Sequence, residues 1–267
     1  MTRHPSSRAA CAARRRSRTP TAPRSAAGLA AALLALLLTG CDPTAGQRPS
    51  TVTPPADSML APVAGKPQAR APVDSLMAHI DGFQFRNGDL SSQHRVQHYC
   101  GHVSADAMQC ALFDSTSPHA KLVGVEYVIS ERLFGELPEA EKPYWHSQLH
   151  PVKAGTLLAP GLPEEAEHAL ASRLARTYAK TWRLWPVEER AEVPLGVPQL
   201  MMGFTQDGQL DRALLAERDR ELGVASAEKQ RLRQDIPATP VAPGADAWQD
   251  GRIARVQGQV ERPARSR

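Results

Sequence analysis

The stretch that decides the fold is residues 109–129, Q-C-A-L-F-D-S-T-S-P-H-A-K-L-V-G-V-E-Y-V-I. Its last part, residues 122–129, is rich in β-branched side chains and predicts the strongest strand of the chain. Residues 109–113 predict a second strand, and residues 114–118 between the two form a turn cluster. Neighbouring strands joined by a short turn favour an antiparallel hairpin.

The segments on either side extend this sheet and add helices. Residues 96–103 alternate weakly and predict a third strand. Ser130 fits the cap of a short helix, and Pro138 opens another that would carry Trp145 and His146. Further elements are predicted as a helix over 163–180, strands over 181–187 and 200–204, and a helix over 210–222. Without a regular βαβ period or a glycine-rich phosphate loop, the pattern favours a single α+β domain with a mainly antiparallel sheet.

The N-terminus resembles a secretory targeting signal. Residues 3–24 are basic, and residues 26–38 form an apolar run too short for a membrane span, at about 20 Å of helix against a hydrocarbon core of about 30 Å. L-T-G-C follows and ends at Cys41, in the pattern of a bacterial lipobox whose cysteine carries palmitate-type acyl chains. We therefore predict a lipoprotein signal peptide over 1–40 and a cell-envelope protein that faces the periplasm and is anchored to the membrane through Cys41. Asp42 resembles a signal for retention at the inner membrane.

The net positive charge of the whole chain, +4, comes from this signal peptide. Seven arginines and no acidic residue precede Cys41, so cleavage leaves 25 basic residues (32 less 7) against 28 acidic ones, a net charge of −3. Such a protein lacks the positive surface that binding to a phosphate backbone requires, so we expect no nucleic-acid partner. Proline-rich composition predicts a disordered tether over 41–73 and a disordered tail over 237–267, flanking a domain over 74–236.

Metal-capable side chains gather in the middle of the domain. His98, Cys100 and His102 alternate, so on a strand all three share one face. Zinc or copper could bind such ligands, but side chains two apart on a strand rarely converge on one ion. Glu126, His146 and His150 are the donors that could complete the site. Glu126 lies inside an apolar strand, where an unpaired carboxylate is costly, so it needs a partner. The alternative is a buried hydrogen-bonded cluster without a metal.

Cys100 and Cys110 allow a second choice. Two thiols on either side of a turn could form a disulfide in an oxidising compartment, or remain as redox-active thiols. The aromatic and methionine side chains of the later strands could likewise line a lipid pocket or fill the core. The sequence leaves each of these alternatives open.

Several blocks in the middle of the chain, in the same order, resemble the plant oil-body-associated proteins and their bacterial and fungal relatives, a family of unknown biochemistry. The blocks are H-I-D-G-F (79–83), H-Y-C-G-H (98–102), Q-C (109–110), L-V-G-V-E-Y-V-I-S (122–130), W-H-S (145–147), K-T-W (180–182), P-L-G-V-P-Q-L-M-M (194–202) and D-G-Q (207–209). The resemblance covers residues 73–236 and implies a shared fold and a loose association with lipid surfaces, but no catalytic residues. Because some of these relatives are intracellular, it weighs slightly against a permanent Cys100–Cys110 bond.

Three functions therefore compete. The favoured one is a non-enzymatic envelope lipoprotein that binds lipid or a protein partner. The alternatives are a metal-binding protein or metal-dependent enzyme using His98, Cys100 and His102, and a structural component of the envelope. The sequence does not decide whether the chain is an enzyme.

Overall fold

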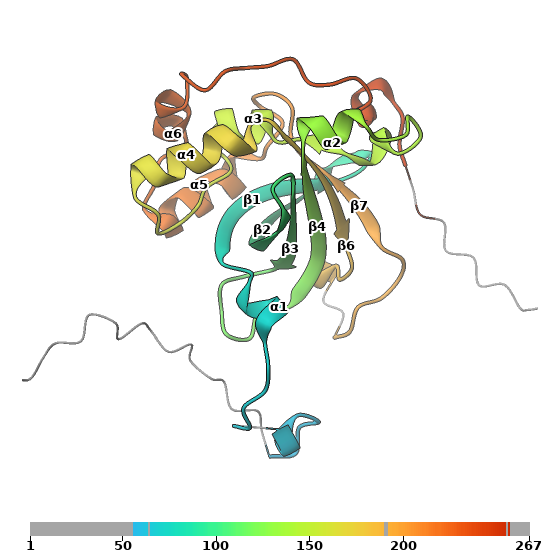
Figure 1. Ribbon diagram of the computed structural model, residues 1–267, viewed down its shortest axis with the longest axis vertical. Coiled ribbons are helices and arrows are strands. Elements are labelled where there is room, and N and C mark those ends of the chain that lie inside the picture. Colours follow the sequence, from blue (N-terminus) through green and yellow to red (C-terminus); the bar gives the residue numbers. More distant parts are fainter. Residues whose placement is uncertain (1–55, 64, 190–191, 255, 257–267) are drawn as a thin grey trace, which may run out of the picture. The chain divides into compact units, whose positions relative to one another are not determined.

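The computed structural model describes residues 56–63, 65–189, 192–254 and 256 (Figure 1). The signal peptide over 1–40 and the lipidation of Cys41 lie outside these residues and stay predictions. The strands are β1 (Ala78–Arg86), β2 (Asp89–Ser104), β3 (Ala107–Phe113), β4 (Leu122–Ser130), β5 (His146–Ser147), β6 (Thr177–Arg183) and β7 (Gln199–Met202). The helices are α1 (Ala71–Asp74), α2 (Glu131–Gly135), α3 (Leu149–Lys153), α4 (Glu164–Leu174), α5 (Arg212–Leu222) and α6 (Ser226–Leu232), with 3₁₀ turns η1 (Ala61–Val63), η2 (Lys142–Tyr144), η3 (Val187–Glu189) and η4 (Ala247–Asp250).

The predicted hairpin is confirmed and forms part of a closed barrel. β3 pairs antiparallel with β4, with Cys110 opposite Glu126. The strand order is β4-β3-β2-β1-β7-β6-β5, and the additional pairing of β4 with β6 closes the ring. Every pairing is antiparallel, so the α+β prediction with a mainly antiparallel sheet is correct. β1 and β2 join at a tight turn, where Gly88 has a φ of 82° that favours glycine.

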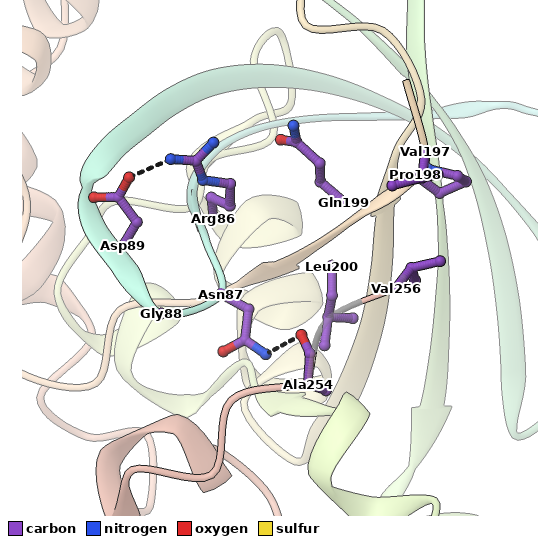
Figure 2. A pocket seen from close by; sticks show the side chains of 10 residues that line it. All are labelled: Arg86, Asn87, Gly88, Asp89, Val197, Pro198, Gln199, Leu200, Ala254 and Val256. Atoms are coloured by element: carbon purple, nitrogen blue, oxygen red, sulfur yellow. Dashed lines mark hydrogen bonds and ion pairs between the residues drawn. The ribbon is translucent and has the colours of Figure 1, made fainter. Parts of the chain in front are cut away.

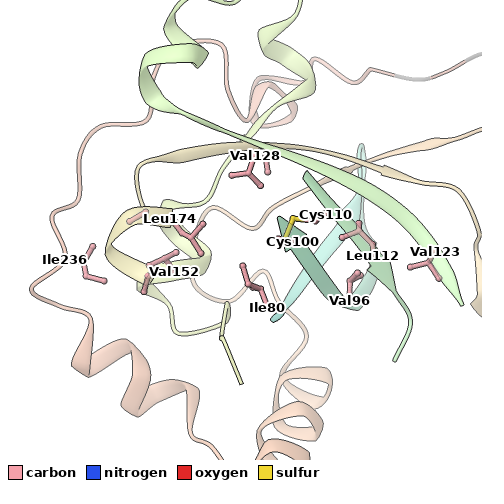
Figure 3. Packing of buried hydrophobic residues seen from close by; sticks show 13 residues of the cluster. Ile80, Val96, Cys100, Cys110, Leu112, Val123, Val128, Val152, Leu174 and Ile236 are labelled. Carbon is pink, nitrogen blue, oxygen red and sulfur yellow. A yellow bond between two sulfur atoms is a disulfide. The ribbon is translucent and has the colours of Figure 1, made fainter. Parts of the chain in front are cut away.

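Alternation along the strands separates the barrel interior from its outer face. The interior is filled by an apolar cluster that includes Ile80, Val96, Leu112 and Val128 (Figure 3). A second cluster around Phe85 and the third around Phe134 pack outside the barrel wall. Met201, Met202 and Phe204 are buried, and Trp182 packs against the second cluster. These four side chains therefore form core, whereas Trp185 is only partly buried.

A buried ion pair attaches the C-terminal helices to the barrel. Figure 1 shows α3, α4, α5 and α6 grouped together beside the barrel. Arg218 on α5 reaches Asp81 on β1 and also donates to the carbonyl oxygens of Gly155 and Thr156. Asp211 caps the start of α5, and Gly223 ends the helix with a φ of 64°. A guanidinium paired with a carboxylate and two carbonyls satisfies the polar groups that burial would otherwise leave costly.

Two predicted helices are corrected. The helix predicted over 163–180 ends at Leu174, because residues from Thr177 onward pair with β4 as strand β6. The helix predicted to carry Trp145 and His146 is a single 3₁₀ turn, and His146 lies on the short strand β5 opposite Ala179. The cap at Ser130 is confirmed, since its hydroxyl accepts a hydrogen bond from the Leu133 amide.

The predicted disordered tail begins too early. Past residue 237 the chain still packs on the domain: Ala247 is fully buried, and the Trp248 ring meets Phe85 edge-on with 4.9 Å between centroids. Asp246 is buried as well, and its carboxylate accepts the backbone N–H of Ser147. Small and apolar residues among the prolines supply this packing, so composition alone gave the wrong boundary. Residues 257–267 lie outside the described part of the chain.

Candidate functional site

Three strands bring His98, Glu126 and Thr181 together inside the barrel. Glu126 on β4 lies opposite Thr181 on β6, whose hydroxyl donates to Glu126 Oε2 over 2.5 Å. His98 on β2 places its Nε2 3.6 Å from the same oxygen, and its Nδ1 lies 3.2 Å from the Ile80 carbonyl oxygen. The prediction that Glu126 finds a histidine partner is thus matched by the geometry.

His146 approaches the same group from β5. Glycine at position 203 makes room for the ring, since a Cβ there would lie 2.8 Å from His146 Cδ2. The ring is buried, and its Nδ1 has no hydrogen-bond partner among the described residues. Burial lowers the pKa of His146 to about 4, although the charge of Glu126 acts in the opposite direction. His146 is therefore neutral at physiological pH.

The electrostatics of His98 and Glu126 favour an ion pair. Burial alone would lower the pKa of His98, but the charge of Glu126 and its hydrogen bond raise it above the ordinary value. Burial is the largest single influence on Glu126 and opposes its ionisation, but the charge and hydrogen bond of His98, with the hydrogen bond from Thr181, together lower the Glu126 pKa. A charged pair with a neutral histidine beside it is what this arrangement stabilises.

The remaining predicted ligands lie elsewhere. His102 is exposed beyond the end of the buried part of β2, so it is not part of the group. Cys100 is bonded to Cys110, with 1.98 Å between the sulfurs (Figure 3). The expectation from the family resemblance, which weighed slightly against a permanent disulfide, is therefore wrong. Among the described residues, no set of three or more His, Cys, Asp or Glu side chains is arranged to hold a metal ion. Zinc at His98, His102, Glu126 and His146 therefore stays a prediction without a matching geometry.

The interior group is best described as structural. Both side chains of the His98–Glu126 pair are less than one-tenth exposed, so a substrate would have no access to them. The contacts among His98, Glu126 and Thr181 join β2, β4 and β6 across the barrel interior. A surface site has to be sought outside the barrel.

The end of the barrel where β6 ends and β7 begins is exposed and apolar. The apolar loop, residues 192–198, is exposed throughout, with Val193, Leu195 and Val197 at 57%, 60% and 42% exposure. Leu122 and Leu184 are 46% and 39% exposed at the same end, where the Leu184 amide bonds the Val123 carbonyl. Exposed apolar side chains that gather in this way make this end a candidate interaction surface.

An aromatic ring and a cation lie beside this apolar end. Lys121, which precedes β4, places its ammonium 5.0 Å from the centre of the Trp185 ring. Tryptophan is enriched at the boundary between lipid and water because its ring is apolar and its N–H is polar. No helix among the residues that the structure describes is long and apolar enough to cross a membrane.

The fold and these two regions define a class: a closed antiparallel barrel with a buried polar network and an apolar end. Residues 70–237 match the family model described as "Protein of unknown function (DUF1264)", and the chain belongs to this family. No solved structure matches the chain significantly.

The curated relatives are plant proteins. The chain is 36% identical over 183 residues to "Oil body-associated protein 1B" of Arabidopsis thaliana, which covers 68% of this chain and 76% of the relative. It is 35% identical over 219 residues to "Oil body-associated protein 1A" of Zea mays, which covers 81% and 91%. It is also 34% identical to "Oil body-associated protein 2B" of Zea mays, over 78% of this chain and 84% of the relative.

These relatives correct the predicted location. The lipobox pattern at Cys41 predicted an envelope lipoprotein facing the periplasm, whereas the relatives that match are plant proteins named for oil bodies. The family resemblance itself is confirmed, and the periplasmic assignment is withdrawn.

Proposed function

We propose that the protein is a non-enzymatic component of a lipid surface and that it docks through the apolar loop, residues 192–198. The observation that carries the proposal is the exposure of Val193, Leu195 and Val197, each between 42% and 60% exposed at one end of the barrel. Full burial of an aliphatic side chain is worth about 1.5–3 kcal/mol, so three half-exposed ones gain about 2–4 kcal/mol on entering lipid.

The surroundings of the loop support this orientation. Leu122 and Leu184 extend the apolar area toward the barrel wall, and Trp185 with Lys121 lies where the lipid–water boundary would fall. The names of the relatives supply an independent reason to choose lipid over a protein partner, because they are oil-body-associated proteins. Membrane attachment through a lipidated Cys41 remains a separate prediction.

The test uses the full chain carrying Cys41→Ser, so that acylation cannot contribute. Binding to triacylglycerol droplets coated with phosphatidylcholine is measured by flotation. A triple variant, Val193→Ser, Leu195→Ser and Val197→Ser, is expected to bind at least about tenfold more weakly, because a loss of 1.4 kcal/mol already gives tenfold.

A matched triple variant controls for the loss of exposed apolar area. Met77, Val103 and Leu162 are 86%, 62% and 46% exposed. Met77 precedes the start of β1, Val103 is near the end of β2, and Leu162 lines the same pocket as Met77, so none of the three is part of the apolar loop. Changing these three to Ser should leave flotation unchanged. Flotation that survives the loop variant, or that both triple variants abolish equally, would contradict docking through the apolar loop.

A further inference from the structure

We propose that the pocket beside the apolar loop binds the headgroup of a zwitterionic phospholipid, with Arg86 facing the phosphate and Asp89 facing the ammonium group. This inference rests on the proposed lipid-surface function and names the lipid that the surface would present.

The pocket lies where three strand ends meet. It has a volume of about 510 Å³ and is bounded by the end of β1, the start of β2 and the start of β7 (Figure 2). Its lining residues are Arg86, Asn87, Gly88, Asp89, Val197, Pro198, Gln199, Leu200, Ala254 and Val256. Val197 belongs to both the pocket and the apolar loop, so a lipid beneath the loop would have its headgroup beside the pocket.

Two opposite charges occupy one side of the pocket. Arg86 Nη2 bonds Asp89 Oδ2, and the two side chains are 42% and 34% exposed. The hydroxyl and amide of Ser91 hold the other oxygen of Asp89 in place. Among the described residues Asp89 is the one hydrogen-bond partner of the Arg86 side chain, so most of the guanidinium N–H donors remain for a further acceptor such as a phosphate oxygen.

The other side of the pocket is suited to the glycerol and first acyl carbons. Val197, Pro198, Leu200 and Val256 are apolar, and Figure 2 shows Val197 and Val256 on the side away from Arg86 and Asp89. The Gln199 amide lies between the two halves, without a side-chain hydrogen bond to another described residue. A ligand with a charged head and an apolar stem matches this division.

The local charge selects a zwitterion over an anion. Hydrogen bonds from Ser91 and Arg86 lower the pKa of Asp89 to about 2, so its carboxylate is charged at physiological pH and repels a purely anionic headgroup. Glu192, the first residue of the apolar loop, is exposed and adds a negative charge to that loop. An ammonium group is the complement that Asp89 favours, while Arg86 retains donors for the phosphate.

The test measures binding of soluble short-chain lipids to the full chain by calorimetry, below their micellar concentrations. We expect dihexanoyl-phosphatidylethanolamine to bind about fivefold or more tightly than dihexanoyl-phosphatidylglycerol, which has the phosphate but no ammonium group. Free phosphoethanolamine should bind more weakly than the lipid, because it lacks the apolar stem. Equal affinity for the two lipids would overturn the proposal without any variant, and equal binding of the free headgroup would assign the site to a soluble phosphate ester.

Two variants then assign the roles. Asp89→Asn should abolish the preference for the ethanolamine lipid, and Arg86→Gln should weaken both lipids. Removing the exposed pair Arg132–Asp106 by Arg132→Gln is the matched control and should change neither. An unchanged preference in Asp89→Asn would contradict the assignment. Because these affinities are measured without a surface, a failure here with droplet binding intact removes only this inference, whereas loss of droplet docking by the loop removes the function on which it rests.

Discussion

Arg218 Nη1 donates a hydrogen bond to Asp81 Oδ1 over 3.0 Å, and neither side chain is exposed to solvent. The two residues are 137 positions apart, so the bond joins helix α5 to the first strand of the barrel. The Phe83 ring lies 5.0 Å from the guanidinium carbon, and Arg95 and Gln97 bond the second oxygen of Asp81. The Asp81 carboxylate therefore accepts hydrogen bonds from one residue of α5 and two residues of β2.

Removing one partner should be severely destabilising. Arg218→Met leaves the buried Asp81 carboxylate with Arg95 as its remaining charged partner, and we expect a loss of about 3–5 kcal/mol in the free energy of unfolding. Urea denaturation checks this value. The double variant Arg218→Met with Asp81→Asn should recover part of the loss, since position 81 then carries no buried charge that has lost Arg218. A single variant as stable as the native chain would show that the pair does not hold α5 in place.

The stability that the His98–Glu126 pair contributes should fall both at high pH and at low pH. The raised pKa of His98 gives stability that is complete below its ordinary value of 6.5 and is lost as pH rises through the folded value. The lowered pKa of Glu126 gives stability that is present above 4.5 and is lost as pH falls through the folded value. The difference in unfolding free energy between the native chain and Glu126→Gln should therefore be largest between these limits, at about 2–4 kcal/mol. A difference independent of pH would contradict the ion pair.

Asp246 should act in the opposite sense. Burial raises its pKa from 3.8 to about 7, so ionisation destabilises the fold progressively as pH rises between these values. Asn at this position keeps an acceptor for the Ser147 amide and tolerates the φ of 51°. Asp246→Asn should match the native chain near pH 4 and exceed its stability at pH 8, by about 1–4 kcal/mol. Thermal denaturation at the two pH values measures the gain, and a variant less stable at pH 8 would refute it.

The Cys100–Cys110 disulfide should stabilise the barrel. The cysteines are ten residues apart, and closing a loop of this size stabilises by about 3 kcal/mol in the chain-entropy model. Replacing both with Ala should lower the free energy of unfolding by at least this amount, because both side chains are buried. Alkylation of the unfolded, unreduced chain should leave these two cysteines unmodified. Modification of both would show that the bond is absent.

Local sequence patterns predicted the central hairpin and part of the interior group. The β-branched run over 122–129 is strand β4, and the alternation of His98 with Cys100 does place both inside the barrel. The same alternation wrongly included His102, because a period of two fixes the face of a strand but not where the barrel ends. His146 was assigned to a helix, since a strand of two residues leaves no periodic signal.

Contacts between residues far apart in the chain leave no local pattern in the sequence. Nothing near Asp81 or Arg218 in the sequence indicates that they meet, and Thr181 was not recognised as the hydroxyl partner of Glu126. The apolar loop was visible in the sequence only as the family block P-L-G-V-P, and its exposure follows from its place at the end of the barrel. Proline and glycine keep this segment out of the sheet, so its valines and leucine remain uncovered.

The most direct test of docking through the apolar loop follows an environment-sensitive fluorophore at single positions. In a chain carrying Cys11→Ser and Cys41→Ser, the label is attached at Leu195→Cys or, as a control, at Val103→Cys, which is also exposed in the native chain. Phosphatidylcholine-coated droplets should raise and blue-shift the emission at position 195, and quenchers carried on the acyl chains should reduce it, while position 103 stays unchanged. An unchanged signal at position 195, or equal changes at both positions, would contradict the account.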